Sequence, residues 1–454
     1  MGALAFLALW GAGPGGCGSS TSEPTPAGGS GGTATGGSGG TSAGGTPGGD
    51  VTGGSGGGAT PTTGHGGAGA GGSPGSGGRI PGTGGAASGG AAGAVLWGTG
   101  GGAGLGAAGT GGAQTGGSFG SGGGGGTSGG NGLPWLTVKG NKLQDPTGKT
   151  IILRGSALID IGSLYWYGGQ SAAGITARMD KVAAAGVQGH VVRLPVYPKI
   201  DYNTGGGAAC SPCPYPVGTG PTAGCTPTSP LSSADYVAKV LKPAVDYATS
   251  KNLYVIIDYH QIDNATSGTS GADAVTFWTD IAPRFAGASN VLYEPFNEPI
   301  DYNVPWSTLK PVVQRLIDSI RTGAPKNIII VPSNAWDQHP GDAASDPPTG
   351  TNLMYTAHIY PSNWSAAFQA QVATASAKVP VFISEWGFAN TDPSSFGPSL
   401  QTTVNGDGAS WTAWVTDNAW TPSMFADANL TTLTNFGMLV KSWLSATANS
   451  DWVQ

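Results

Sequence analysis

The sequence predicts a (β/α)8 TIM barrel preceded by a disordered linker rich in Gly, Ser and Thr. Strand-like apolar runs alternate with helical patterns over residues 133–454. The nearly continuous apolar character of the runs is typical of parallel strands covered on both faces. The alternative is a doubly wound open sheet, which would need a phosphate-binding glycine turn after its first strand. The segment "LRGSALID" at residues 153–160 is not such a turn.

Eight apolar runs are expected to form the barrel strands, with helical patterns between them. The expected strands are residues 150–158, 190–196, 253–260, 291–299, 327–333, 353–361, 380–388 and 409–415. The expected helices are residues 175–186, 232–252, 270–286, 305–323, 363–378 and 434–448. The first of these ends on Gly186 and the fourth on Gly323, and glycine is a common helix stop.

The glycines define the domain organisation. Most of the chain's 84 glycines lie in residues 18–132. Such a segment has too little apolar surface to offset the entropy lost on ordering, so we expect a flexible linker. We therefore expect a signal-like segment at residues 1–17, a linker at 18–132 and one large domain at 133–454.

The N-terminus resembles a secretory signal. Its apolar run, Ala3–Trp10, is too short to span a bilayer, so no transmembrane segment is expected. Cys17 precedes Gly-Ser-Ser and resembles a bacterial lipoprotein acylation site, although Pro14 stands where such sites favour Leu. We expect a secreted protein. A lipid anchor at Cys17, which would tether the domain to the cell surface or outer membrane, is the alternative.

Charge and cysteine content restrict the partners. The net charge is −6 without a long basic run, which argues against nucleic acid and anionic membranes as partners and suits a neutral substrate. Cys210, Cys213 and Cys225 cluster in one loop. A loop disulfide is favoured over a zinc site because the loop offers no fourth ligand, and the sequence leaves open which cysteine stays unpaired.

Polar residues follow most of the expected strands, at the end where barrels of this kind carry their active sites. These residues are Arg193, His260, Asn297, Glu298, His358, Tyr360, Glu385 and Trp414. Glu298 and Glu385, on the fourth and seventh strands, are a pair of carboxylates that could face each other across a cleft. Cleavage of a glycosidic bond requires such a pair, and a separation of about 5–5.5 Å gives retention of configuration.

The C-terminal domain resembles glycoside hydrolase family 5, the cellulase family. The resemblance rests on "FNEP" with Glu298, "HIY" with His358 and Tyr360, and "ISEWGF" with Glu385. It extends to "LTVKGNKLQDPTGKTIILRG", "VVRLPV", "VIIDYH" and "SWTAW". A single Asn-Glu-Pro would be weak evidence, but this ordered set is specific.

The resemblance implies retaining hydrolysis, with Glu298 as acid/base and Glu385 as nucleophile. By the same resemblance, Arg193 would keep Glu385 ionised and Tyr360 would donate a hydrogen bond to it. Asn297 would hold the sugar 2-hydroxyl, and Trp414 would stack beneath the sugar. His260 and His358 would bind hydroxyls or tune the acid. A raised pKa at Glu298 and a low pKa at Glu385 would suit these roles. Trp336 is a further candidate sugar platform, with packing as an equal alternative.

Two buried acids are expected to be structural. Glu294 has the same strand parity as Glu298 but should lie about 13 Å deeper, paired with a cation inside the barrel. Asp258 points inward two residues before His260. A metal cluster of Asp258, His260 and His358 would compete with the glycosidase roles. No metal or cofactor is therefore expected.

The expected function is hydrolysis of a β-1,4-linked polysaccharide within the chain by a monomeric enzyme, with cellulose or mixed β-glucan as substrate. An endo-β-mannanase or another β-glycanase of the same fold is the alternative. A non-catalytic carbohydrate-binding surface protein is more distant, because both glutamates are present. The loop at residues 198–231 is expected to wall one end of the cleft.

Overall fold

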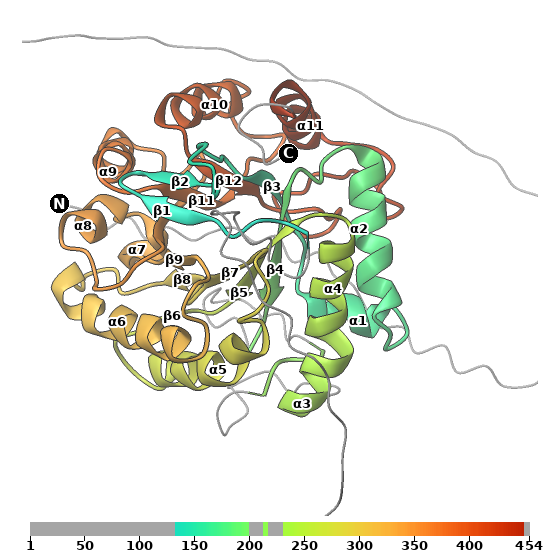
Figure 1. Cartoon of the computed structure of the whole chain (residues 1–454). Helices are drawn as coiled ribbons and strands as arrows, with labels where there is room; N and C mark the ends of the chain where they lie inside the picture. Colours follow the sequence, from blue (N-terminus) through green and yellow to red (C-terminus); the bar gives the residue numbers. More distant parts are fainter. Residues whose placement is uncertain (1–131, 199–211, 217–229, 449–454) are drawn as a thin grey trace, which may run out of the picture. The chain divides into compact units, whose positions relative to one another are not determined.

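The structure, a computed structural model, describes residues 132–198, 212–216 and 230–448 (Figure 1). The predicted signal segment, the linker, Cys17, Cys210 and Cys225 lie outside the described residues. Of the helices that are described, none combines the length and the apolar character needed to cross a membrane.

Eight parallel strands form a closed barrel, as the sequence predicted. In barrel order they are β3 (Arg154–Ala157), β4 (Val191–Val196), β5 (Tyr254–Tyr259), β7 (Val291–Glu294), β9 (Ile329–Val331), β10 (Leu353–Ile359), β11 (Val381–Trp386) and β12 (Ser410–Ala413). Every expected strand is confirmed. The expected strand at 291–299 is divided, however, because β7 ends at Glu294 and the chain resumes as β8 (Glu298–Pro299) beside β6 (Ile262–Asp263).

Helices surround the barrel and link its strands (Figure 1). They are α1 (Ile161–Tyr167), α2 (Ala173–Ala185), α3 (Ser233–Tyr236), the π-helical turn η1 (Val237–Leu241), α4 (Lys242–Ser250), α5 (Ser270–Arg284), α6 (Trp306–Gly323), α7 (Asn334–Asp337), α8 (Pro340–Ser345), α9 (Ala366–Ser376), α10 (Phe396–Asp407) and α11 (Asn435–Thr447). The six expected helices are present. The sequence did not indicate α1, which begins where the carboxylate of Asp160 accepts hydrogen bonds from the backbone N–H groups of Gly162 and Ser163.

An antiparallel hairpin of β1 (Thr137–Lys139) and β2 (Lys142–Gln144) packs at the amino-terminal ends of the barrel strands. Leu136 and Leu143 are buried there with Tyr254 and Leu292, in a cluster separate from the main core. This end of the barrel is therefore apolar and filled. The polar side chains gather at the opposite end, where the strands run into the helices.

Candidate active site

Arg193 lies at the centre of the polar layer. Its side chain is fully buried in β4 and donates from Nε to Glu294 (2.7 Å) and from Nη1 to Glu385 (2.9 Å). Nη2 contacts Asn297 Oδ1 at 2.5 Å and Asp258 Oδ2 at 3.0 Å. Burial disfavours the charge, but these carboxylates outweigh it and raise the pKa of Arg193. One guanidinium thus organises side chains from several strands.

Glu385, near the end of β11, is held as a carboxylate. The hydroxyl group of Tyr360 donates to its Oε1 at 2.5 Å, and Arg193 donates to its Oε2. Burial raises the pKa of Glu385, yet the charges of His358 and Arg193 and the Tyr360 hydrogen bond bring it below its ordinary value. A buried, ionised carboxylate at this position can act as a nucleophile.

The pKa of Glu298, in β8, is shifted in the opposite direction. Its Oε1 lies 2.8 Å from His358 Nδ1, and its residue is 8% exposed. Burial raises the pKa of Glu298, and the nearby charge of Glu385 adds to this, against the opposing effect of His358. Glu298 therefore tends to keep a proton while Glu385 loses its own, which is the division of pKa that an acid and a nucleophile require.

The two carboxylates lie close to one another. Glu298, His358 and Glu385 each offer one ligand atom, and these atoms all lie within 4.8 Å of one another. Such a group has the composition of a metal site. The same two carboxylates are, however, the pair that glycosidic cleavage requires, and their spacing is nearer to that of retaining enzymes (about 5–5.5 Å) than to that of inverting ones (about 6.5–9.5 Å).

Glu294 pairs with a cation, Arg193, as the sequence predicted. The expected depth of about 13 Å below Glu298, derived from regular strand rise, is wrong. His358 contacts both acids, with Nε2 at 3.7 Å from Glu294 and Nδ1 at 2.8 Å from Glu298. The reason is that the chain turns after β7 instead of continuing as an extended strand, so the two carboxylates share one imidazole.

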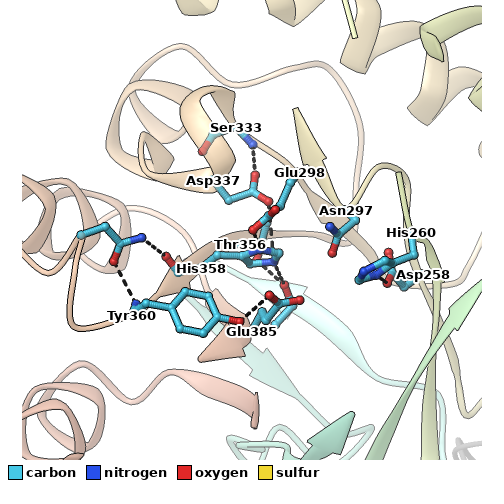
Figure 2. Close-up of polar contacts among 12 residues, drawn as sticks. Asp258, His260, Asn297, Glu298, Ser333, Asp337, Thr356, His358, Tyr360 and Glu385 are labelled. Carbon is cyan, nitrogen blue, oxygen red and sulfur yellow. Dashed lines mark hydrogen bonds and ion pairs between the residues drawn. The ribbon is translucent and has the colours of Figure 1, made fainter. Parts of the chain in front are cut away.

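Asn297 and His260 complete this layer (Figure 2). The Nδ2 group of Asn297 is buried and has no hydrogen-bond partner among the described residues, so it is a donor that a bound molecule could use. His260 is positioned by Asp258, with 2.6 Å between Nδ1 and Oδ2. Asp258 thus has the structural contacts that were expected of it.

Trp414, the expected platform beneath the sugar, differs from expectation. Trp414 does not present an open ring face, because it is 0% exposed and the ring of His260 stacks on it with centroids 5.2 Å apart. Trp386 and Trp411 also lie near strand ends, but they pack against Trp443 in the core. Trp336 is half-buried and directly precedes Asp337, whose carboxyl group lies beside His358.

Three residues near the site were not found from the sequence. Tyr302 is 65% exposed, and its ring centroid lies 6.0 Å from that of Trp336. Asp337 is fully buried beside His358. Ser384 bonds His358 and Glu294. Strand alternation alone would turn Ser384 away from Glu385, and the register irregularity between β10 and β11 that brings it inward has no signature in the sequence.

Only a small part of the loop at 198–231 is described. Cys213 is buried and forms no disulfide among the described residues. Tyr215 packs on Phe277 of α5 and Tyr236 of α3, and its hydroxyl group bonds Asp280. This part of the loop is therefore fixed to the outer helices. The predicted disulfide and the expected cleft wall depend on residues outside the described part.

Comparison with protein families matches residues 144–420 to Cellulase (glycosyl hydrolase family 5). An endoglucanase of Clostridium saccharobutylicum is 31% identical over 195 residues, which are 41% of this chain and 42% of the relative. Endoglucanase E-5 of Thermobifida fusca is 33% identical over 150 residues, 32% of each chain. The chain thus spans less than half the length of these curated relatives.

Solved structures show the same fold. The β-glucanase SdGluc5_26A of Saccharophagus degradans aligns with a TM-score of 0.56 at 23% identity, over 69% of this chain and 93% of that chain. The catalytic domain of the Thermobifida fusca endoglucanase aligns with a TM-score of 0.51 at 23% identity, over 68% of this chain and 97% of that chain.

Proposed function

We propose, because this chain belongs to glycosyl hydrolase family 5, that it hydrolyses β-1,4-linked glucan within the polysaccharide chain and retains the anomeric configuration. The observation that carries the proposal is the pair Glu298 and Glu385, whose closest carboxylate atoms lie within 4.8 Å and whose pKa values are displaced in opposite directions. Cleavage within the chain, and glucan as the substrate, are supported by relatives that are named endoglucanases.

The first step uses both acids at once. A Glu385 carboxylate oxygen attacks the anomeric carbon while Glu298 transfers its proton to the glycosidic oxygen, so that the bond to the departing sugar breaks. Arg193 and Tyr360 hold Glu385 in place through their hydrogen bonds. The product is a covalent glycosyl-enzyme, and Glu298 is left as a carboxylate.

The second step reverses the role of Glu298. The carboxylate removes a proton from water, the water oxygen attacks the anomeric carbon, and the bond to Glu385 breaks. Two inversions at the same carbon give net retention. His358 contacts Glu298 in both steps, and its own pKa, lowered by burial but raised more by the surrounding carboxylates, favours the charged imidazolium.

Several other residues of this layer are proposed to hold the sugar. The free Nδ2 donor of Asn297 suits the 2-hydroxyl group, a contact that strengthens in the transition state. His260 is proposed to contact another hydroxyl, and Trp414 to support the ring of His260 from behind. Trp336 and the exposed Tyr302, whose rings lie near each other, are proposed to offer aromatic faces on which a neighbouring sugar of the chain could stack.

The test is product analysis on carboxymethylcellulose, barley glucan, glucomannan and mannan. We expect a rapid fall in viscosity on the two glucans and β-configured new reducing ends by proton NMR. The variants Glu298→Gln and Glu385→Gln should each have a kcat about 10²–10⁴-fold below that of the wild type. Wild-type turnover by either variant would contradict the mechanism, and preference for mannan would support the alternative substrate.

A second experiment separates the two roles. Azide can enter the space left by a missing carboxylate. Glu385→Ala should therefore give an α-glycosyl azide by direct displacement, whereas Glu298→Ala should give a β-glycosyl azide through the covalent intermediate. The opposite pairing of product with variant would reverse the assignment of acid/base and nucleophile.

We also propose that the protein is exported and acts as a monomer. The apolar run near the N-terminus supports export, and acylation at Cys17 would leave it attached to the cell surface. Cell fractionation of the wild type and of Cys17→Ala separates these states. Release of only the variant into the medium would indicate a lipid anchor.

A further inference from the structure

Asp337 lies beside the proposed acid/base group, and the role proposed for it rests on the proposed function. Asp337 ends α7, in which Ala335, Trp336 and Asp337 have φ angles of 55°, 56° and 58°. Each non-glycine residue in this left-handed region is strained, because its Cβ atom lies too close to the following carbonyl oxygen. Such strain is concentrated where the position of a side chain matters for function. In this turn the ring of Trp336 lies near that of Tyr302, and the side chain of Asp337 is buried beside His358.

The carboxyl group of Asp337 has few partners. Its Oδ1 accepts one hydrogen bond from the backbone N–H of Ser333 (2.5 Å). Its Oδ2 is buried and has no hydrogen-bond partner among the described residues. That oxygen lies 3.7 Å from His358 Nε2, which is itself closer to Ser384 Oγ, at 3.0 Å. Figure 2 shows the carboxyl group pointing toward Glu298 and the imidazole ring of His358.

An ionised carboxylate is poorly accommodated in such a place. Burying a charge with a single hydrogen bond is costly, and the His358 imidazole, although within ion-pair distance at 3.7 Å, is beyond hydrogen-bond distance. The groups that face Asp337 are His358 from β10, Glu298 from β8 and Glu294 from β7. Burial raises the pKa of Asp337 well above its ordinary value, and the two glutamates add to this effect against the opposing effect of His358.

We propose that Asp337 is a positioning residue of the acid/base group, and that its carboxyl stays a neutral acid beside Glu298 and His358 throughout the reaction. Glu298 becomes a carboxylate when it protonates the departing sugar oxygen. A second negative charge next to it would oppose that step. A neutral Asp337 adds no such charge, and its O–H can donate a hydrogen bond to the new carboxylate. Asp337 exchanges no proton with the substrate, so the proton balance of both steps is unchanged.

The first test needs no substrate, so its outcome does not depend on the proposed function. The full-length protein is prepared with ¹³C in the aspartate carboxyl groups, and the Asp337 signal is assigned through its backbone resonances. We expect this signal to keep the chemical shift of a protonated acid at about pH 6, where surface aspartates are ionised. Titration of Asp337 together with the surface aspartates would overturn the proposal.

The second test uses two variants of similar size. Asp337→Asn replaces the neutral acid by a neutral amide that can still bond Ser333 N–H. It should keep kcat within about threefold and leave the alkaline limb of the kcat/KM profile, which reports Glu298, in place. If Asp337 were ionised in the wild type, removing its charge would lower the pKa of Glu298. A downward shift of that limb would therefore contradict the proposal.

Asp337→Leu removes the hydrogen-bonding groups and keeps the volume. We expect kcat to fall at least about tenfold, with KM within about twofold and the alkaline limb displaced. An unchanged kcat and an unchanged profile would show that Asp337 only fills space. The matched control is Asp301→Asn, another buried acid, whose carboxyl oxygens accept hydrogen bonds from the Ala265 N–H and the Thr266 hydroxyl group. It should leave both pH limbs in place.

Discussion

At the scale of single residues, Glu298 and Glu385 are distinguished by their donors. The Glu385 carboxylate accepts hydrogen bonds from Arg193 and Tyr360, whereas the carboxyl group of Glu298 has one side-chain partner among the described residues, His358. Hydrogen bonds to an ionised carboxylate stabilise the charged form. This additional donor, together with the charges of His358 and Arg193, lowers the pKa of Glu385, which supports the proposed roles of Glu385 as nucleophile and of Glu298 as acid.

Tyr360→Phe should shift the acidic limb of the kcat/KM profile. The Tyr360 hydroxyl group lowers the pKa of Glu385, so its removal should raise that pKa, by about one unit for a hydrogen bond to a charged group. The enzyme then needs a higher pH to ionise its nucleophile. Initial rates across pH measure the shift. The alkaline limb should not move, and an acidic limb that stays in place would show that the hydroxyl group does not tune Glu385.

At the scale of elements, the barrel depends on a close approach between β3 and β4. A Cβ atom at Gly155 would lie 1.8 Å from the carbonyl oxygen of Val191. No side chain fits there unless the strands move apart. Because Arg193 follows Val191 in the same strand, this contact also helps to determine where the guanidinium lies.

Gly155→Ala should destabilise the domain by at least about 1–3 kcal/mol, because overpacking displaces backbone and not a flexible side chain. Chemical denaturation measures the change. Gly287→Ala is the matched control, since a Cβ there meets nothing within 4 Å. We expect the control to remain within about 0.5 kcal/mol of the wild type. Equal stability of the two variants would argue against the close approach.

At the scale of the whole molecule, the polar layer balances its own charge. The cations Arg193 and His358 offset the carboxylates Glu294 and Glu385. Three further acids have raised pKa values, mainly because of burial: Asp258, Glu298 and Asp337. The pKa values of Asp337 and His358 lie well above their ordinary values, so at these two groups the folded state holds protons that the unfolded chain loses as the pH rises.

Stability should therefore fall as the pH rises from about 5.5 to about 8. A group whose folded pKa is raised stabilises the fold only while it keeps its proton, at about 1.4 kcal/mol per pH unit for each proton. The pKa of Glu294 is lowered to about 2, so its stabilising contribution is already complete above the ordinary value of 4.5 and does not change over this pH range. Burial lowers the pKa of His190, so the unfolded chain binds this proton more readily than the folded state does, and His190 opposes the trend by at most one proton. Urea unfolding at both pH values tests this, and greater stability at the higher pH would contradict it.

The domain boundary gives a second prediction at this scale. A chain that begins at residue 133 should unfold within about 2 °C of the full chain and hydrolyse a soluble glucan at a rate within about twofold. Calorimetry and reducing-end assays on both chains measure these quantities. A large loss of stability in the shorter chain would show that residues before 133 contribute to the folded domain.

The sequence by itself determined the barrel and its eight strands, and it predicted Glu298 and Glu385 as the acid pair that we propose. The apolar runs that form the strands can be recognised directly in the sequence. The carboxyl ends of parallel strands meet at one end of a barrel, so the residues that follow the strands are expected to lie together. The sequence also predicted the partners of Glu385. Helix α1 was missed because its start depends on a cap and not on periodicity.

Only the tertiary structure decided how the acids share their neighbours. The turn after β7 brings Glu294 to the same imidazole as Glu298, and the left-handed turn of α7 brings in Asp337. Both turns interrupt regular strand or helix geometry. Positions inferred from residue spacing assume that this geometry is regular, so the sequence did not predict them. Whether a tryptophan such as Trp414 is an open platform or a covered wall depends likewise on what packs against it, here the ring of His260.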